Sequence, residues 1–247
     1  MAVLLAVWEI SVKACHVSPL LFPPVEAVLA TLWEGFTKGD LLQQSLYSFG
    51  IIALGLVIAL VLAFILALLS VQFRIAGSLI DTITAIAHPL PGLALLPLII
   101  MWFGTGSGAV LAIIVHSALW PMLLNFITGF AAVPTIYLDT GRNLSMKPFA
   151  ITCEIMVRSA AGYALSGVKI GWARAWRALI SAEMAFGAVG LVGGIGWYIL
   201  KERTFMNTAG LFAGIIVVIV MGMLVEDVLF ATLEKHTVQK WGMSAKN

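Results

Sequence analysis

The residues most suited to chemistry in this sequence lie between positions 169 and 183, inside a long apolar stretch. Two arginines of this segment, Arg174 and Arg177, stand about one helical turn apart. A guanidinium group binds a carboxylate, a sulfonate or a similar oxyanion through two parallel hydrogen bonds. We therefore interpret the segment as the lining of a translocation path for an anion, with five candidate residues: Lys169, Arg174, Trp176, Arg177 and Glu183.

Charges are costly in such a segment, because each charged side chain at the centre of a membrane helix is unfavourable by about 2.5–3.5 kcal/mol. They must therefore face protein, water or one another. An alternative interpretation is that the arginines neutralise Glu183 and helix-end carbonyls within the bundle, or reach to the membrane interface. Small residues on a second face of the same predicted helix favour close packing on a neighbouring helix: Ala160, Ala164, Gly167, Gly171, Ala175, Ala178 and Ala182.

A second informative segment begins at Pro134, a residue suited to the start of a helix. Apolar side chains then alternate with polar ones at near-helical spacing, at Ile136, Tyr137, Leu144 and Phe149. The pattern predicts a short amphipathic helix over about 135–150 that lies outside the bilayer. Such a helix is a docking element, and its partner is either the membrane surface or another protein.

A cluster of glycines follows the charged segment, at Gly187, Gly190, Gly193, Gly194 and Gly196. Glycine destabilises a regular helix by roughly 1 kcal/mol relative to alanine, so the cluster predicts a bent or re-entrant loop at the outer mouth of the fold. Gly190, Gly193 and Gly194 are the candidate gate residues of this loop. A close-packed turn without a moving role explains the glycines equally well.

The composition places these segments in a membrane. Of the 247 residues, 61% are apolar and 11% are charged, and the mean hydropathy is +1.05. A soluble domain carries about 25% charged residues, so a soluble enzyme is excluded. The net charge of +2 is too balanced to suggest a nucleic-acid partner.

A single all-α membrane domain over 1–247 is therefore expected, with about six spans. The first is short, and a polar connection at 18–44 with a short amphipathic helix follows it. Three prolines predict a kink in the third span, Pro89, Pro91 and Pro97. The predicted spans are about 1–17, 46–70, 79–103, 109–131, 159–187 and 209–231.

Basic residues in the short loops orient these spans, because cytoplasmic loops are enriched in Lys and Arg. Seven basic residues fall on one side, which is predicted to be cytoplasmic together with both termini: Arg74, Arg142, Lys147, Arg158, Lys235, Lys240 and Lys246. Three fall on the other side: Lys38, Lys201 and Arg203. The two cysteines, Cys15 and Cys153, then lie on opposite faces, which argues against a disulfide.

Motifs of other functional classes are missing from the sequence. There is no GxxxxGK[ST] phosphate loop, no HExxH or GxSxG motif and no paired Cys/His ligand set. Neither a nucleotide site nor a metal site is therefore expected on this chain. Two histidines within or beside spans, His88 and His116, are more simply explained as packed and hydrogen-bonded than as a proton relay.

Three separated segments resemble ABC importer permeases of the nitrate/sulfonate/taurine type, over about residues 18–243. They are 89–104 (PLPGLALLPLIIMWFG), 139–183, and 237–243 (TVQKWGM). The resemblance implies a type I importer fold in a bacterial inner membrane. It also implies four kinds of neighbour: a second permease copy forming a homodimer, two cytoplasmic ABC ATPases that hold ATP and Mg, an extracytoplasmic solute-binding protein, and membrane lipid.

Within this resemblance, 135–150 looks like the coupling helix that docks in a groove of the ATPase. The family pattern Glu-Ala-Ala-Arg-x-Leu-Gly corresponds to Asp139-Thr-Gly-Arg-Asn-Leu-Ser145 here, so Ser145 stands at the glycine position. The implied coupling residues are Asp139, Arg142, Asn143, Leu144 and Lys147. The implied function is alternating-access import of a small anion; a secondary transporter and a non-transporting assembly subunit are the alternatives.

Overall fold

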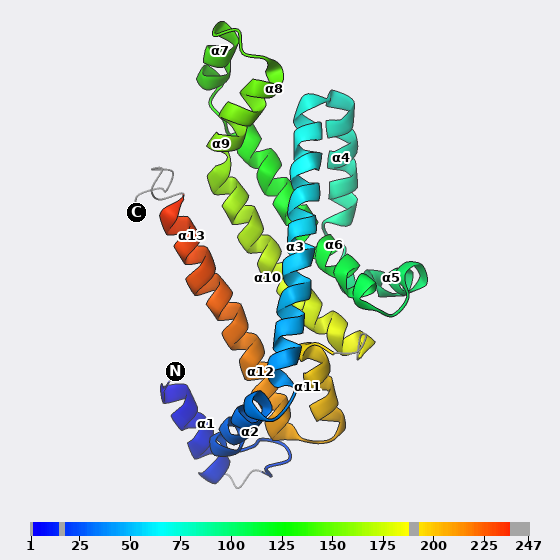
Figure 1. Ribbon diagram of the computed structural model, residues 1–247, viewed down its shortest axis with the longest axis vertical. Helices are drawn as coiled ribbons and strands as arrows, with labels where there is room; N and C mark the ends of the chain where they lie inside the picture. The colour runs from blue at the N-terminus through cyan, green and yellow to red at the C-terminus, as the bar shows by residue number, and fades with distance from the viewer. Residues whose placement is uncertain (1, 15–17, 188–192, 238–247) are drawn as a thin grey trace.

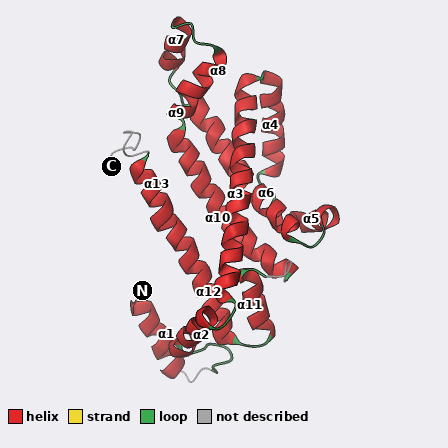
Figure 2. Cartoon of the chain, in the orientation of Figure 1, coloured by secondary structure: helices red, strands yellow, loops and turns green. Residues whose placement is uncertain are grey.

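The computed structural model describes residues 2–14, 18–187 and 193–237, and within them every regular element is a helix (Figure 2). The first half contains α1 (Ala2–Ala14), α2 (Val25–Thr37), α3 (Leu41–Gln72), α4 (Arg74–Ala87), the 3₁₀ turn η1 (Gly92–Leu95), α5 (Leu96–Phe103) and α6 (Ser107–Ala131). The second half contains α7 (Thr135–Asn143), α8 (Pro148–Ala150), the π-helix η2 (Ile151–Met156), α9 (Val157–Ser159), α10 (Ala161–Phe186), α11 (Ile195–Thr204), α12 (Thr208–Met223), the π-helix η3 (Leu224–Phe230) and α13 (Ala231–His236).

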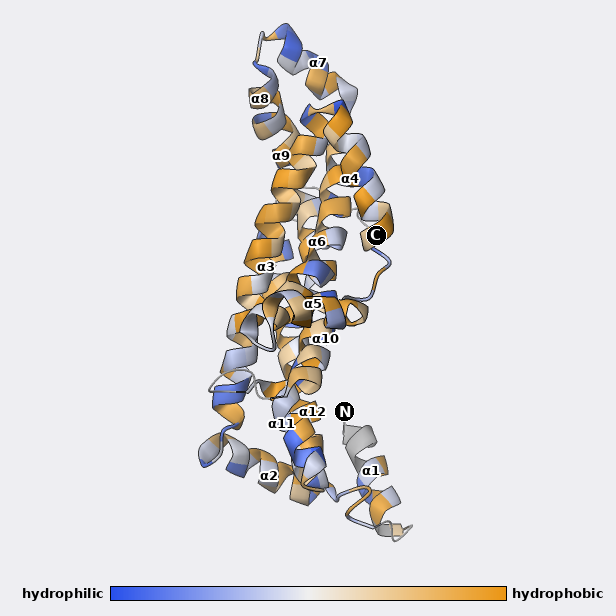
Figure 3. Ribbon diagram, turned by 90° about the vertical axis from the view of Figure 1, so that its right-hand side faces the viewer, coloured by the Kyte–Doolittle hydropathy of each residue, from blue (hydrophilic) through white to orange (hydrophobic). Residues whose placement is uncertain are grey.

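Three described helices are long and apolar enough to cross a membrane: α3, α6 and the continuous run α12–η3–α13. The 26 residues of α10 give it a length of about 39 Å, which also suffices for a crossing despite its charges. Figure 3 shows an apolar body with hydrophilic residues concentrated at its two ends, near α7 and near α2 and α11. The all-α membrane fold is therefore confirmed.

The remaining two predicted spans differ from regular crossings. The 13 residues of α1 give about 20 Å of helix, so a full crossing at 1–17 stays a prediction, and residues 1 and 15–17 lie outside the described part. The proline-rich span is broken, because α4 and the η1–α5 segment meet at 91°. The kink expected from Pro89 and Pro91 is thus a sharp bend, and six crossings stay a prediction.

The core of the bundle lies where α3, α6 and α10 pack together (Figure 1). Four of its largest fully buried side chains come from α6: Ile113, Ile114, Met122 and Leu123. The small-residue face of α10 lies against α6, as predicted. At Gly167 a β-carbon would stand 2.8 Å from Asn125 Cβ and 3.3 Å from Met122 Cα, so the two backbones approach too closely for a side chain there.

We expect Gly167→Leu to lower the stability of the protein, because the inserted atoms meet the backbone of α6, which cannot move aside cheaply. Overpacking of this kind costs about 1–3 kcal/mol. Gly50→Leu is the matched control, since Gly50 has nothing within 4 Å of the position of a β-carbon. The thermal midpoint of the protein in detergent should fall for Gly167→Leu alone. Equal midpoints for the two variants would contradict the packing described here.

Candidate functional site

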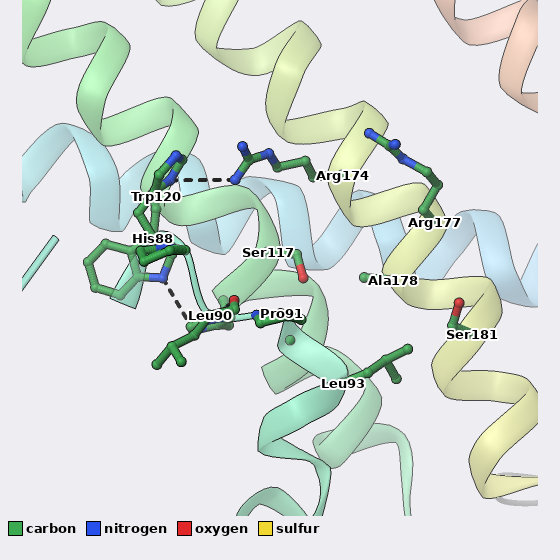
Figure 4. A pocket seen from close by; sticks show the side chains of 13 residues that line it. His88, Leu90, Pro91, Leu93, Ser117, Trp120, Arg174, Arg177, Ala178 and Ser181 are labelled. Atoms are coloured by element: carbon green, nitrogen blue, oxygen red, sulfur yellow. Dashed lines mark hydrogen bonds between the residues drawn. The ribbon is translucent and has the colours of Figure 1, made fainter. Parts of the chain in front are cut away.

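A pocket of about 650 Å³ opens near the middle of α10, between this helix, α6 and the bend that follows α4 (Figure 4). The bend supplies one wall and approaches α6 closely. A β-carbon at Gly92 would stand 2.8 Å from Ser117 Oγ, so glycine allows the bend to lie directly on α6. Broken helices near the midplane of the bilayer are a recurrent feature of transporter substrate sites.

His116 of α6 forms a hydrogen bond with the bend that makes this wall. The sharp bend leaves the carbonyl of Leu90 outside any helix, and His116 Nε2 lies 3.2 Å from that oxygen. Trp120 Nε1 donates to His116 Nδ1 at 3.2 Å, so the proton of the ring is on Nε2 and points to Leu90. His116 therefore satisfies a backbone carbonyl that the bend leaves free, and it behaves as the packed, hydrogen-bonded histidine expected from the sequence.

Two arginines of α10 give the pocket its charge. Arg174 reaches across to the bend, where its Nη1 lies 3.5 Å from His88 Nδ1 (Figure 4). Arg177 Nε donates to the carbonyl of Ala173 at 2.9 Å, which leaves its two terminal amino groups for other partners. Ser117 and Ser181 add hydroxyl groups, and none of the thirteen described residues that line the pocket is acidic. The pocket is therefore suited to an anion.

The other three residues predicted for the path do not line this pocket. Lys169 Nζ pairs with Glu234 Oε2 of α13 at 3.1 Å. Trp176 is 7% exposed and stacks on Trp172, with ring centroids 5.4 Å apart and an interplanar angle of 14°. Lys169 is thus paired with α13, and Trp176 stacks on its own helix, because successive residues of α10 face different partners as the helix turns.

Glu183 is the third of these, and it is 1% exposed. Its carboxyl group accepts hydrogen bonds from Ser48 of α3 and from the backbone of Gly196 in α11. The alternative in which the arginines neutralise Glu183 is not what the structure shows, since the described groups that hydrogen-bond to this carboxyl group are a hydroxyl and a backbone amide.

Two acidic residues, Glu226 and Asp227, were missed by the sequence reasoning. Both are exposed in the π-helix η3, which interrupts the last long apolar helix. The cost of a charge in a membrane applies to them as it does to the arginines. Their position inside the apolar segment 209–231 is the sequence signal that marks them. Two adjacent carboxylates in this span must meet water or another protein surface.

The predicted docking segment lies at one end of the molecule, beyond the long helices (Figure 1). Arg142 and Asp139 pair at 2.9 Å, with 68% and 57% of their side chains exposed. Apolar side chains are exposed beside them, among them Leu144 at 71%. The single helix predicted over 135–150 is wrong in extent, because α7 ends at Asn143 and Ser145 has a φ of +56°. That left-handed conformation explains why glycine occupies this place in the related pattern.

The predicted gate glycines are only partly described. Gly190 lies outside the described residues. Gly193 lies against the indole of Trp197, and Gly194 lies against the carboxyl group of Glu183, so neither position has room for a side chain. Both described glycines are therefore close-packed at the start of α11.

The long apolar helices, the bent span and the cationic pocket define a polytopic membrane protein of the solute-transport class. Comparison with known proteins then identifies the family. The profile of the binding-protein-dependent transport system inner membrane components matches residues 55–239, and the chain belongs to this family. It is thus a multi-pass inner membrane permease component, and the predicted relationship to ABC importer permeases is confirmed.

Individual relatives are similar over most of their length. The taurine transport system permease protein TauC of Escherichia coli is 26% identical over 92% of this chain and 82% of its own. The nitrate import permease protein NrtB of Synechocystis is 27% identical, over 96% and 86%. NrtB of Synechococcus elongatus is 25% identical, over 80% and 72%. These matches favour the importer permease over a secondary transporter or a non-transporting assembly subunit.

Proposed function

We propose that this permease forms the translocation path for a small oxyanion of the sulfonate, nitrate or carboxylate class. The observation that carries the proposal is the pocket beside α10, with Arg174 and Arg177 and no acidic residue among its described lining. Two forked guanidinium groups match the oxygen geometry of such anions. The similarity to taurine and nitrate permeases supports the same substrate class.

The proposed complex contains a second copy of the chain, two cytoplasmic ATPase subunits that hold ATP and Mg, and an extracytoplasmic solute-binding protein. The α7 end, with its exposed Leu144 and its ion pair, is the proposed ATPase contact. The opposite end, with α2 and α11, faces the binding protein. The excess of basic residues on the α7 side supports a cytoplasmic location for that end and for both termini.

In this arrangement the chain itself carries out no chemical step. ATP binding draws the two ATPases together, α7 follows them, and the permease pair alternates between outward and inward access. The anion passes by exchanging its hydration for hydrogen bonds from the arginines and from the hydroxyl groups of Ser117 and Ser181. Because the pocket remains open on one side, the anion can enter and leave without being fully desolvated.

The test is uptake by the complete transporter in proteoliposomes that contain or lack ATP. We expect uptake of taurine, methanesulfonate or nitrate to require ATP and to survive collapse of the proton and sodium gradients. Choline serves as the cationic comparison and should not be taken up. Uptake that follows an ion gradient without ATP would overturn the proposal in favour of a secondary transporter. An assembled complex that moves none of these three solutes would overturn the substrate class.

A further inference from the structure

A buried junction joins three helices at the end of α10 that lies away from α7. Ser48 Oγ of α3 donates to Glu183 Oε1 at 2.7 Å and lies 2.9 Å from Oε2. The amide of Gly196 donates to Glu183 Oε2 at 2.8 Å, and the amide of Ile195 donates to Ser48 Oγ at 2.9 Å. Glu183, Ser48 and the first turn of α11 thus form one hydrogen-bonded unit that is closed to solvent.

The junction supplies the hydrogen-bond acceptors that the first amides of α11 lack. The first amides of a helix have no acceptor within the helix, and the residue before the first turn usually provides one from its side chain. Here that residue is Gly194, which has no side chain to offer. The carboxyl group of Glu183 and the hydroxyl group of Ser48 take its place, and a carboxylate is also favoured at the positive end of the helix dipole.

The backbone of α11 is fitted closely around this carboxyl group. A β-carbon on Gly194 would overlap the carboxyl group itself, and one on Gly196 would stand 2.8 Å from Glu183 Cβ. Two positions therefore require glycine because α11 begins directly on Glu183. The close fit means that a displacement of the end of α10 must displace the start of α11 as well, or break the hydrogen bonds between them.

A single helix connects this junction with the other functional features. At its first residue α10 adjoins α9 and the segment that carries α7, near its middle it presents Arg174 and Arg177 to the pocket, and in its last turn it carries Glu183. Its 26 residues form one unbroken α-helix, which transmits a displacement of one end to the other. Glu183 is therefore placed where a movement that begins at α7 would pass to α11.

We propose that Glu183 is a positioning residue that couples the movement of α10 to α11, so that the end of the path opposite α7 opens and closes in step with α7. This inference rests on the proposed function, because it takes α7 as the ATPase contact. Glu183 acts through the backbone of α11 and does not contact the transported anion. Its role differs from that of the two arginines, which lie on the same helix but in the pocket.

The test compares Glu183→Gln and Ser48→Ala with Ser45→Ala in the complete reconstituted transporter. Glutamine keeps the shape of the side chain but has one acceptor oxygen where the junction uses two. Ser45 is the matched control, because it is buried in the same helix but donates only to the carbonyl of Leu41, within α3 and its own turn. The quantity measured is the number of anions taken up per ATP hydrolysed.

We expect uptake per ATP to fall about tenfold in Glu183→Gln and Ser48→Ala, a change of the order of one lost hydrogen bond, while Ser45→Ala matches the original protein. A purely structural role would lower uptake and ATP hydrolysis together, in proportion to the folded complex, and would leave their ratio unchanged. An unchanged ratio in both variants overturns the proposal. If Glu183→Gln does not assemble, Ser48→Ala decides, because it leaves the bond from Gly196 in place.

The double variant adds a second criterion. If Glu183 and Ser48 act as one unit, combining Glu183→Gln with Ser48→Ala should lower the ratio little further than either change alone. Fully multiplicative effects would show that the two residues act separately and would overturn the shared junction. The unsubstituted protein distinguishes the two proposals. If it shows no ATP-driven uptake, the proposed function is wrong. If it shows normal uptake and the variants keep the same uptake per ATP hydrolysed, only the role proposed for Glu183 is wrong.

Discussion

Replacing both Arg174 and Arg177 by glutamine should lower the rate of anion uptake by about a hundredfold, and either replacement alone by about tenfold. Each arginine offers charge-assisted hydrogen bonds, which are worth about 1.5–3 kcal/mol each. The described lining of the pocket contains no other arginine or lysine to replace them. Glutamine keeps most of the length of the side chain but neither its charge nor its fork. Initial rates of taurine or nitrate uptake, measured against concentration, give the result.

Two comparison variants separate a role in the pocket from a general loss of charge. Arg74→Gln removes the same charge from an exposed position at the start of α4, outside the pocket, and should transport normally. Arg177→Lys keeps the charge but loses the fork, so an intermediate rate is expected. If the double glutamine variant assembles normally and transports anions at the original rate, the pocket is not the anion path.

Exchanging the charges of the ion pair on α7, with Asp139→Lys and Arg142→Glu combined, should reduce substrate-stimulated ATP hydrolysis to its unstimulated level. The pair is preserved in reverse within the helix, so the helix itself is expected to remain. What changes is the charge that α7 presents to the proposed ATPase, and like charges facing each other at an interface cost several kcal/mol. ATP hydrolysis by the reconstituted complex, with and without loaded binding protein, measures the effect.

The thermal stability of the isolated permease provides the control for exchanging the charges of Asp139 and Arg142. Both side chains are more than half exposed, and an exposed ion pair contributes at most about 1 kcal/mol, so the thermal midpoint of the isolated permease should change little. Loss of stimulation with an unchanged midpoint therefore places the defect at the contact with the ATPase. Full stimulation in a correctly assembled complex would show that α7 is not the coupling element.

Much of α10 was predictable from residue types alone. Small residues at helical spacing predicted a face that packs closely, and Gly167 and Gly171 do lie against Met122 of α6. The charges predicted a helix that cannot face lipid all round, and the arginines do line a pocket. These predictions succeeded because helical periodicity and the cost of charge in a membrane are local properties of a segment.

The bend after α4 was predictable in kind but not in extent. Pro89 and Pro91 predict an interrupted helix, whereas the 91° angle depends on contacts with α6. His116 and Gly92 make those contacts, one through the carbonyl of Leu90 and the other through the absence of a side chain. No local pattern shows that a histidine 26 residues further along the chain will bond to that carbonyl.

The sequence by itself determined that this protein is a helical membrane protein, because a chain with 11% charged residues has too few of them to cover a soluble surface. It also determined which membrane segments carry charged side chains and therefore need a polar or charged partner. Only the tertiary structure decided which partner each charge found: Lys169 meets Glu234, and Glu183 meets Ser48, 135 positions away. The cost of burying a charge requires that some partner exists, but the rotation of each helix and the neighbour beside it select that partner.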